Sequence, residues 1–83
     1  MKDKIELSEM SKKIVVGAVY KHSKGSLCKV VGVALHSETL EEMVVYQHID
    51  GEKLIWVRPL EMFLEKVEIN GVIKERFEYV SNN

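Results

Sequence analysis

The sequence predicts a small, mainly β domain of about five or six antiparallel strands. Three observations lead to this fold class. β-branched residues come in short runs bounded by turn residues, which is the pattern of strands. Two dipeptides that favour tight hairpins, Asp50-Gly51 and Asn70-Gly71, each separate two such runs. The runs do not alternate with long helical segments, so the sequence does not favour a parallel sheet of βαβ units.

The first two predicted strands form a hairpin. Residues 18–22 make a short strand that ends before a turn at Gly25, a residue able to adopt positive φ. The second strand, residues 27–35, is long, and Gly32 in its middle predicts a bulge or a sharp bend. Barrels use such bends to curl a strand from one sheet into the next.

The centre of the chain continues as an antiparallel meander. Residues 36–42 form a connection, which is followed by strands at 43–49 and 53–58. Pro59 ends the second of these strands and can occupy the first position of a helix. We therefore expect one short helical or 3-10 turn near residues 60–64.

The C-terminal part returns to strand character. Four strands in meander, a short helical turn and a closing strand are the order of elements in an SH3-like barrel. We predict one such domain over residues 14–83, preceded by a loosely docked N-terminal arm at residues 1–13. The apolar residues of the strand and turn segments are the predicted core: Val31, Val33, Val45, Ile55, Val57, Phe63, Val67 and Phe77.

Composition argues against several classes of protein. The 83 residues are 46% hydrophobic with a net charge of −1, which fits a globular protein and gives no electrostatic reason to expect nucleic acid. No apolar stretch reaches the roughly 20 residues of a membrane helix, and the first residues lack the apolar run of a signal peptide. Cys28 stands alone and cannot form an internal disulfide. We expect a cytoplasmic protein without a membrane or nucleic-acid partner.

Two strings of residues in the middle of the chain look familiar. They are His36-Ser37-Glu38-Thr39-Leu40-Glu41 and Trp56-Val57-Arg58-Pro59, in this order. On these strings, residues 17–80 resemble an uncharacterised bacterial family, domain-of-unknown-function family 1653. The resemblance implies an SH3-type barrel and no activity. The chain has Ser23 where the family has an aromatic residue and Leu35 where it has an arginine, which weakens the expectation of a strongly cationic or aromatic-lined surface.

Strand direction brings one set of polar and aromatic residues toward the same end of the predicted barrel. A long strand ends just before His36, and the strand that carries Trp56 and Arg58 runs out toward that end. Trp56 and Arg58 share one face because they are two residues apart. In a scaffolding interpretation Glu38 pairs with Arg58 and Trp56 is core. In a functional one Trp56 is a platform, Arg58 binds an anion, and His36 and Glu38 add hydrogen bonds.

The expected function is that of a non-catalytic binding module for an unknown protein or a small anionic ligand. Its candidate ligand-binding residues are His36, Glu38, Thr39, Trp56 and Arg58. One alternative is a small enzyme, or an enzyme's accessory domain, that acts on an anionic metabolite. Another is a structural or oligomerisation domain.

We expect no catalytic residues, no metal ligands and no cofactor. Strand directions separate His36 from the other histidines, His22 and His48. Consecutive residues of an extended segment point to alternating faces, so His36, Ser37 and Glu38 cannot align as a catalytic triad.

Overall fold

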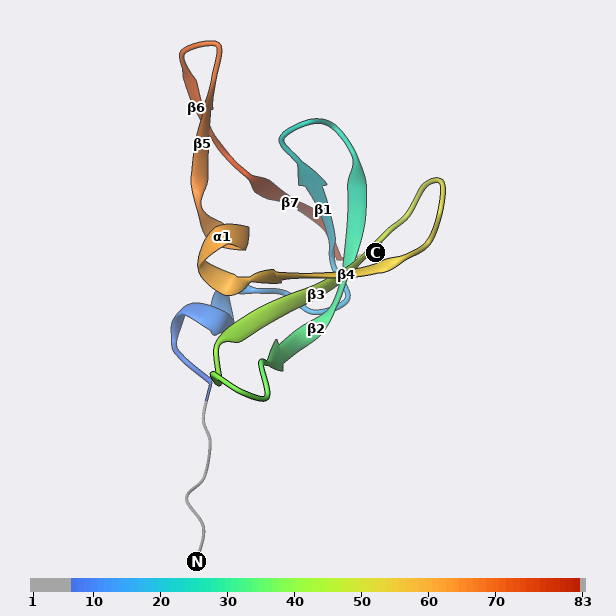
Figure 1. Ribbon diagram of the computed structural model, residues 1–83. Coiled ribbons are helices and arrows are strands. Elements are labelled where there is room, and N and C mark those ends of the chain that lie inside the picture. The colour runs from blue at the N-terminus through green and yellow to red at the C-terminus, as the bar shows by residue number, and fades with distance from the viewer. Residues whose placement is uncertain (1–6, 83) are drawn as a thin grey trace, which may run out of the picture.

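The computed structural model describes residues 7–82, which form seven strands, one 3-10 helix and one short α-helix (Figure 1). Their bounds are η1 Met10–Lys13, β1 Val19–His22, β2 Leu27–Leu35, β3 Glu42–His48, β4 Ile55–Pro59, α1 Leu60–Leu64, β5 Lys66–Ile69, β6 Val72–Glu75 and β7 Phe77–Ser81. The predicted arm at residues 1–13 falls partly outside the described residues, because residues 1–6 are not among them.

The strands make one five-stranded antiparallel sheet and one separate hairpin. The sheet has the order β4-β3-β2-β1-β7, and β5 pairs only with β6. The mainly β class with antiparallel strands is confirmed, and so is the helical turn at residues 60–64. Seven strands are described instead of five or six, because β6 and β7 are distinct strands in different sheets.

The sheet curls without closing into a barrel. The predicted irregularity at Gly32 is confirmed: the β2–β3 register shifts between Val30 and Gly32, which leaves Val31 as the extra residue of a bulge. Strands β4 and β7 are the two edges of the sheet in the described chain, and side chains cross the gap between them. The guanidinium carbon of Arg58 on β4 lies 5.4 Å from the ring centre of Phe77 on β7.

The core fills the concave side of the curled sheet. Phe63 of α1 is fully buried and stacks on Phe77 with ring centres 4.1 Å apart. Tyr20 of β1 and Tyr46 of β3 approach Phe63 at 5.3 Å and 5.8 Å. The other buried members are Leu60 of α1 and apolar residues of the first three strands and their flanks: Ile14, Ala18, Cys28, Val30 and Val44.

Of the eight predicted core residues, two are buried, three are partly buried and three are exposed. Phe63 and Phe77 are buried, Val33 packs against the core, and Val45 and Val67 are partly buried. Val31, Ile55 and Val57 are exposed, and their prediction was wrong. The bulge at Val31 reverses the alternation of β2, and Ile55 and Val57 occupy the convex face of an edge strand.

The segment before β1 is tied to β3. The backbone N–H and the hydroxyl of Ser8 both donate to the Glu42 carboxylate, at 2.6 Å each. These two hydrogen bonds lower the pKa of Glu42 from its ordinary value, because they stabilise its ionised form. The longest helix in residues 7–82 has five residues, so no helix in this part of the chain could span a membrane.

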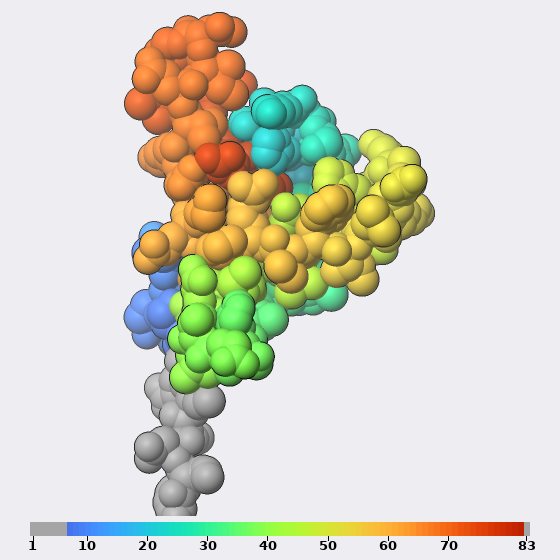
Figure 2. Space-filling model, in the orientation of Figure 1, coloured from blue at the N-terminus to red at the C-terminus, as the bar shows by residue number. Residues whose placement is uncertain are grey.

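The β5–β6 hairpin stands off from the rest of the molecule as a protrusion (Figures 1 and 2). The Arg76 N–H donates to the Glu65 carbonyl at 3.0 Å, and the two side chains form an ion pair. Both contacts close the base of the hairpin. All four residues of β6 are exposed.

Candidate binding pocket

A pocket of about 280 Å³ opens on the concave side of the sheet. The β1–β2 hairpin, β3, β4 and β7 supply its nine lining residues: His22, Lys24, Ser26, Cys28, Tyr46, His48, Trp56, Arg58 and Phe77. Strand register explains why they meet. Cys28 lies opposite His48, and Tyr46 lies opposite Trp56, so these side chains share one face of neighbouring strands. The curl of the sheet then carries Phe77 of β7 across to them.

Five ring side chains form most of the pocket wall. His22 meets Phe77 edge to face with ring centres 4.8 Å apart, and Tyr46 meets Phe77 at 5.3 Å. His48 meets Trp56 edge to face at 6.2 Å. Phe77 and Tyr46 are buried and form the floor, whereas 48% of Trp56 remains exposed. The pocket therefore has a rigid aromatic floor and one ring that is open to a ligand.

Two cations complete the lining, and none of the nine residues is acidic. Arg58 lies over the Phe77 ring, within the usual range of a cation–π contact. Its Nε is buried and has no hydrogen-bond partner in the described structure. Lys24 is exposed at the rim. The pocket is thus positively charged and aromatic.

His22 is a neutral hydrogen-bond donor at neutral pH. Burial lowers the pKa of His22 from its ordinary 6.5, and the nearby Arg58, Arg76, Lys24 and His48 side chains lower it further. The Lys24 backbone N–H donates to His22 Nδ1 at 3.0 Å, so Nδ1 is the acceptor nitrogen. In the neutral ring the hydrogen must therefore sit on Nε2.

Cys28 forms part of the pocket wall but is not a nucleophile. The side chain is buried, and burial raises the pKa of its thiol from 9.0 to about 11. The thiol is therefore protonated at neutral pH, and only the thiolate reacts readily.

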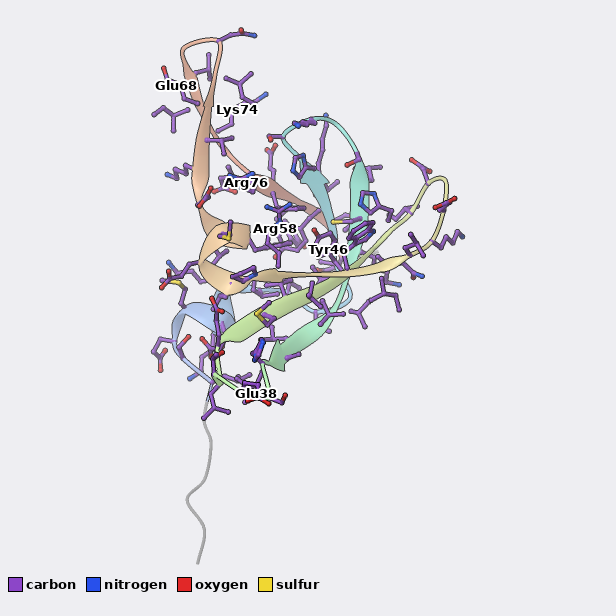
Figure 3. The ribbon with its side chains drawn as sticks, in the orientation of Figure 1. Glu38, Tyr46, Arg58, Glu68, Lys74 and Arg76 are labelled. Carbon is purple, nitrogen blue, oxygen red and sulfur yellow. The ribbon has the colours of Figure 1, made fainter. Side chains whose placement is uncertain are left out.

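The five sequence-predicted site residues lie in two places. Trp56 and Arg58 line the pocket, while His36, Glu38 and Thr39 lie on the β2–β3 loop outside its lining. Figure 3 labels Arg58 beside Tyr46 in the middle of the molecule and Glu38 at one end. The expected Glu38–Arg58 pair is not formed, because the ion pairs of residues 7–82 are Lys12–Glu9 and Arg76–Glu65.

The loop residues use their polar groups on the loop itself. His36 Nδ1 accepts from the N–H groups of Glu38 and Thr39 at 3.0 Å and 3.3 Å. Thr39 Oγ1 accepts from the Glu41 N–H at 3.1 Å. The backbone closes the same turn, with Leu40 N–H donating to the His36 carbonyl at 2.7 Å. These contacts hold the shape of the loop.

Sequence reasoning missed the lining residues outside β4. Strand direction did place His48 near His22, and both line the pocket. Cross-strand register is what brings the others together, since Tyr46 lies opposite Trp56 and Cys28 lies opposite His48. A two-residue turn at Asp50-Gly51 would pair Tyr46 with Ile55 instead, so the turn signal alone misses the observed register by one residue. Phe77 carried no such signal, since β7 reaches the pocket only through the curl.

Comparisons with known proteins give a family. The model of the family described as "Protein of unknown function (DUF1653)" matches residues 18–79. A crystal structure of a protein from Bordetella bronchiseptica, described as belonging to DUF1653, has the same fold with a TM-score of 0.79. It is 29% identical, and the match covers 88% of this chain and 95% of that one. A search of the curated proteins found no match.

Proposed function

This chain belongs to the DUF1653 family of proteins of unknown function, and we propose that it is a non-catalytic binding module whose ligand enters the concave pocket. One observation carries the proposal: five rings and two cations converge on one opening, and no acidic residue lines it. A structural core would bury these rings or pair these charges. Here Trp56 stays half exposed and Arg58 has no ion-pair partner among residues 7–82.

The chemistry of the lining supports binding more than catalysis. A serine or cysteine nucleophile is commonly activated by a base within hydrogen-bond reach of it. No two lining side chains are hydrogen-bonded to each other in the described structure. The Cys28 thiol is protonated at neutral pH, since burial raises its pKa to about 11. We therefore assign no catalytic residue, and we propose Trp56 and Arg58 as ligand contacts.

The loop residues receive a different role in this proposal. His36 and Thr39 shape the β2–β3 loop through their hydrogen bonds, and Glu38 is an exposed residue of that loop. We further propose an SH3-like type for the curled sheet and a cytoplasmic location. The location is supported by a single cysteine that is buried as a free thiol.

A screen for ligands tests the function directly. Trp56 is the only tryptophan in the chain, so its fluorescence and its indole N–H resonance report on the pocket alone. The full chain is titrated with a small-molecule library and with a cell extract fractionated by size. Binding in the pocket shifts both Trp56 signals. If no compound and no fraction shifts either signal, the proposal is wrong.

A second candidate function is self-association through β4. This edge strand has no partner on one side in the described chain, and its convex-face residues Ile55 and Val57 are 61% and 57% exposed. Unpaired apolar edges favour pairing with another chain. Sedimentation equilibrium of the wild type and of Val57→Lys tests it. A monomer at all concentrations rules this candidate out and leaves the pocket unaffected.

A further inference from the structure

We infer that the pocket takes a small aromatic anion: a single ring or fused ring that carries a carboxylate or a phosphate. This ligand class rests on the proposed function and specifies its chemistry. Three properties of the pocket determine the class, namely its charge, its free donors and its open ring.

The charge of the pocket is uncompensated. Arg58 and Lys24 line it, and neither takes part in an ion pair within residues 7–82. Arg58 is half-buried over Phe77, where its charge is partly removed from water. A half-buried cation without a carboxylate is a costly arrangement that a bound anion relieves. A carboxylate or phosphate can accept two parallel N–H bonds from one guanidinium, which favours these two groups.

The donors of the pocket point to the same kind of ligand group. Neutral His22 carries its hydrogen on Nε2, because Nδ1 is occupied by the Lys24 N–H. Arg58 and Lys24 are donors only. Ser26 adds a hydroxyl at the rim. A lining dominated by donors matches an anionic group, which only accepts hydrogen bonds.

The open ring and the size define the rest of the ligand. Trp56 is 48% exposed and is braced at its edge by His48, with ring centres 6.2 Å apart. An indole held in this way offers a flat face on which another ring can stack. The pocket volume of about 280 Å³ is just below the roughly 300 Å³ at which ligand sites usually start. The ligand is therefore small and planar.

Matched probes test the class. The full chain, labelled with ¹⁵N, is titrated with benzoate and phenyl phosphate as ring anions. Benzamide is the neutral ring, and acetate and inorganic phosphate are anions without a ring. We expect at least one ring anion to shift the Trp56 indole and Arg58 Nε resonances. It should bind at least tenfold more tightly than benzamide, acetate and inorganic phosphate.

Variants test the anionic half of the ligand. Lys24→Gln should weaken binding of the ring anion about threefold or more, whereas Lys29→Gln should leave its affinity unchanged. Both variants remove one positive charge, but Lys29 is exposed on the opposite face of β2. Arg58→Met should abolish the preference for the ring anion over benzamide. Because this variant can fail to fold, Arg58→Lys is measured beside it and should keep a reduced preference.

Each of the other outcomes overturns one part of the proposed ligand class or the binding function itself. Equal binding of benzamide and benzoate in the pocket overturns the anionic part, and equal binding of acetate overturns the aromatic part, while the binding function stands. If Lys24→Gln and Lys29→Gln lose the same affinity for the ring anion, the effect comes from the overall charge of the protein. That result also overturns the proposed ligand class. If no probe shifts Trp56 but a library compound does, the class alone fails. If nothing shifts Trp56, the class and the proposed function both fail.

Discussion

Two turns of this molecule begin in the same way and end differently. His22 opens the β1–β2 turn and His36 opens the β2–β3 loop, and each accepts the N–H two residues ahead at Nδ1, at 3.0 Å. The backbone closes both turns, because the Gly25 N–H donates to the His22 carbonyl and the Leu40 N–H to the His36 carbonyl, at 2.7 Å each. In the β2–β3 loop, the Thr39 side chain also accepts a hydrogen bond within the turn. In the β1–β2 turn, the Lys24 ammonium forms no ion pair within residues 7–82 and faces the pocket with Arg58.

The difference teaches how a polar cluster can be interpreted. Polar groups that satisfy one another stabilise a local shape and leave little for a ligand. Polar groups that converge without satisfying one another have hydrogen-bonding capacity left for a partner. By this criterion we propose the pocket rim as the binding region and the β2–β3 loop as a connection. The predictions below test that division from the largest expected effect to the smallest.

Removing the pocket floor should have the largest effect. Phe77 stacks on fully buried Phe63 and also supports Arg58. Phe77→Ala should lower the free energy of unfolding by about 3–5 kcal/mol, the usual cost of deleting a buried phenylalanine ring. Urea unfolding of both proteins measures it. A loss below about 1 kcal/mol would mean that the pocket floor is not part of the core.

Removing the open ring should affect binding and not folding. Trp56→Ala should weaken binding of a pocket ligand about fivefold or more, since stacking on an aromatic residue contributes roughly 1–3 kcal/mol per ring. Its half-exposed side chain predicts a change in stability of less than about 1.5 kcal/mol. Calorimetric titration and thermal unfolding measure the two effects. Thr39→Ala is the control in the β2–β3 loop and should leave affinity unchanged. An equal loss of affinity in this variant would contradict the distinction between the pocket rim and the loop.

Removing the His36 ring, which accepts two hydrogen bonds within the β2–β3 loop, should lower stability and leave ligand binding unchanged. His36→Ala leaves the N–H groups of Glu38 and Thr39 without their partner. We expect a loss of about 0.5–1.5 kcal/mol, the net contribution of an exposed hydrogen bond of this kind. Thermal unfolding measures it, and a pocket ligand should bind as before. Weakened binding in His36→Ala would show that the loop contributes to the site.

Acid should destabilise the fold through His22. Burial and four nearby side chains, Arg58, Arg76, Lys24 and His48, hold the pKa of His22 below its ordinary 6.5. The unfolded chain therefore takes up this proton first, and stability falls as the pH drops below 6.5. Urea unfolding from pH 7.5 to pH 5 should show a smaller decline in His22→Gln. Identical declines in both proteins would contradict this assignment.

The smallest effect belongs to the loop carboxylate. Glu38 is exposed and takes part in no ion pair within the described residues. Glu38→Gln should change the free energy of unfolding by less than about 0.5 kcal/mol, as most surface substitutions do. It should also leave ligand affinity unchanged. A clear change in either quantity would support the Glu38–Arg58 pair of the scaffolding interpretation.

Local patterns were enough for the elements of the fold. Turn dipeptides and β-branched runs predicted the strands, and Gly32 predicted the bulge, because these signals depend on neighbouring residues only. The inward face of each strand was harder. One bulge residue, Val31, reverses the alternation of β2, and a single-residue error moves every side chain to the other face.

The candidate site was predicted in part for the same reason. Trp56 and Arg58 were found because residues two apart on a strand share a face. His36 and Glu38 were grouped with them by strand direction alone, which gives an end of the molecule but not a face. Phe77 was predicted only as core, since its position opposite Arg58 depends on how far the sheet curls. That curl is a property of the whole sheet.

The protruding β5–β6 hairpin has a kinetic consequence. It pairs only with itself and has an exposed second strand, so its amide hydrogens should exchange with solvent through local opening. The Glu65–Arg76 contacts at its base separate this opening from the sheet. We therefore expect the hairpin to open more often than the five-stranded sheet. A protease should cut first near Asn70-Gly71, and the remaining sheet with its pocket should stay intact after the cut.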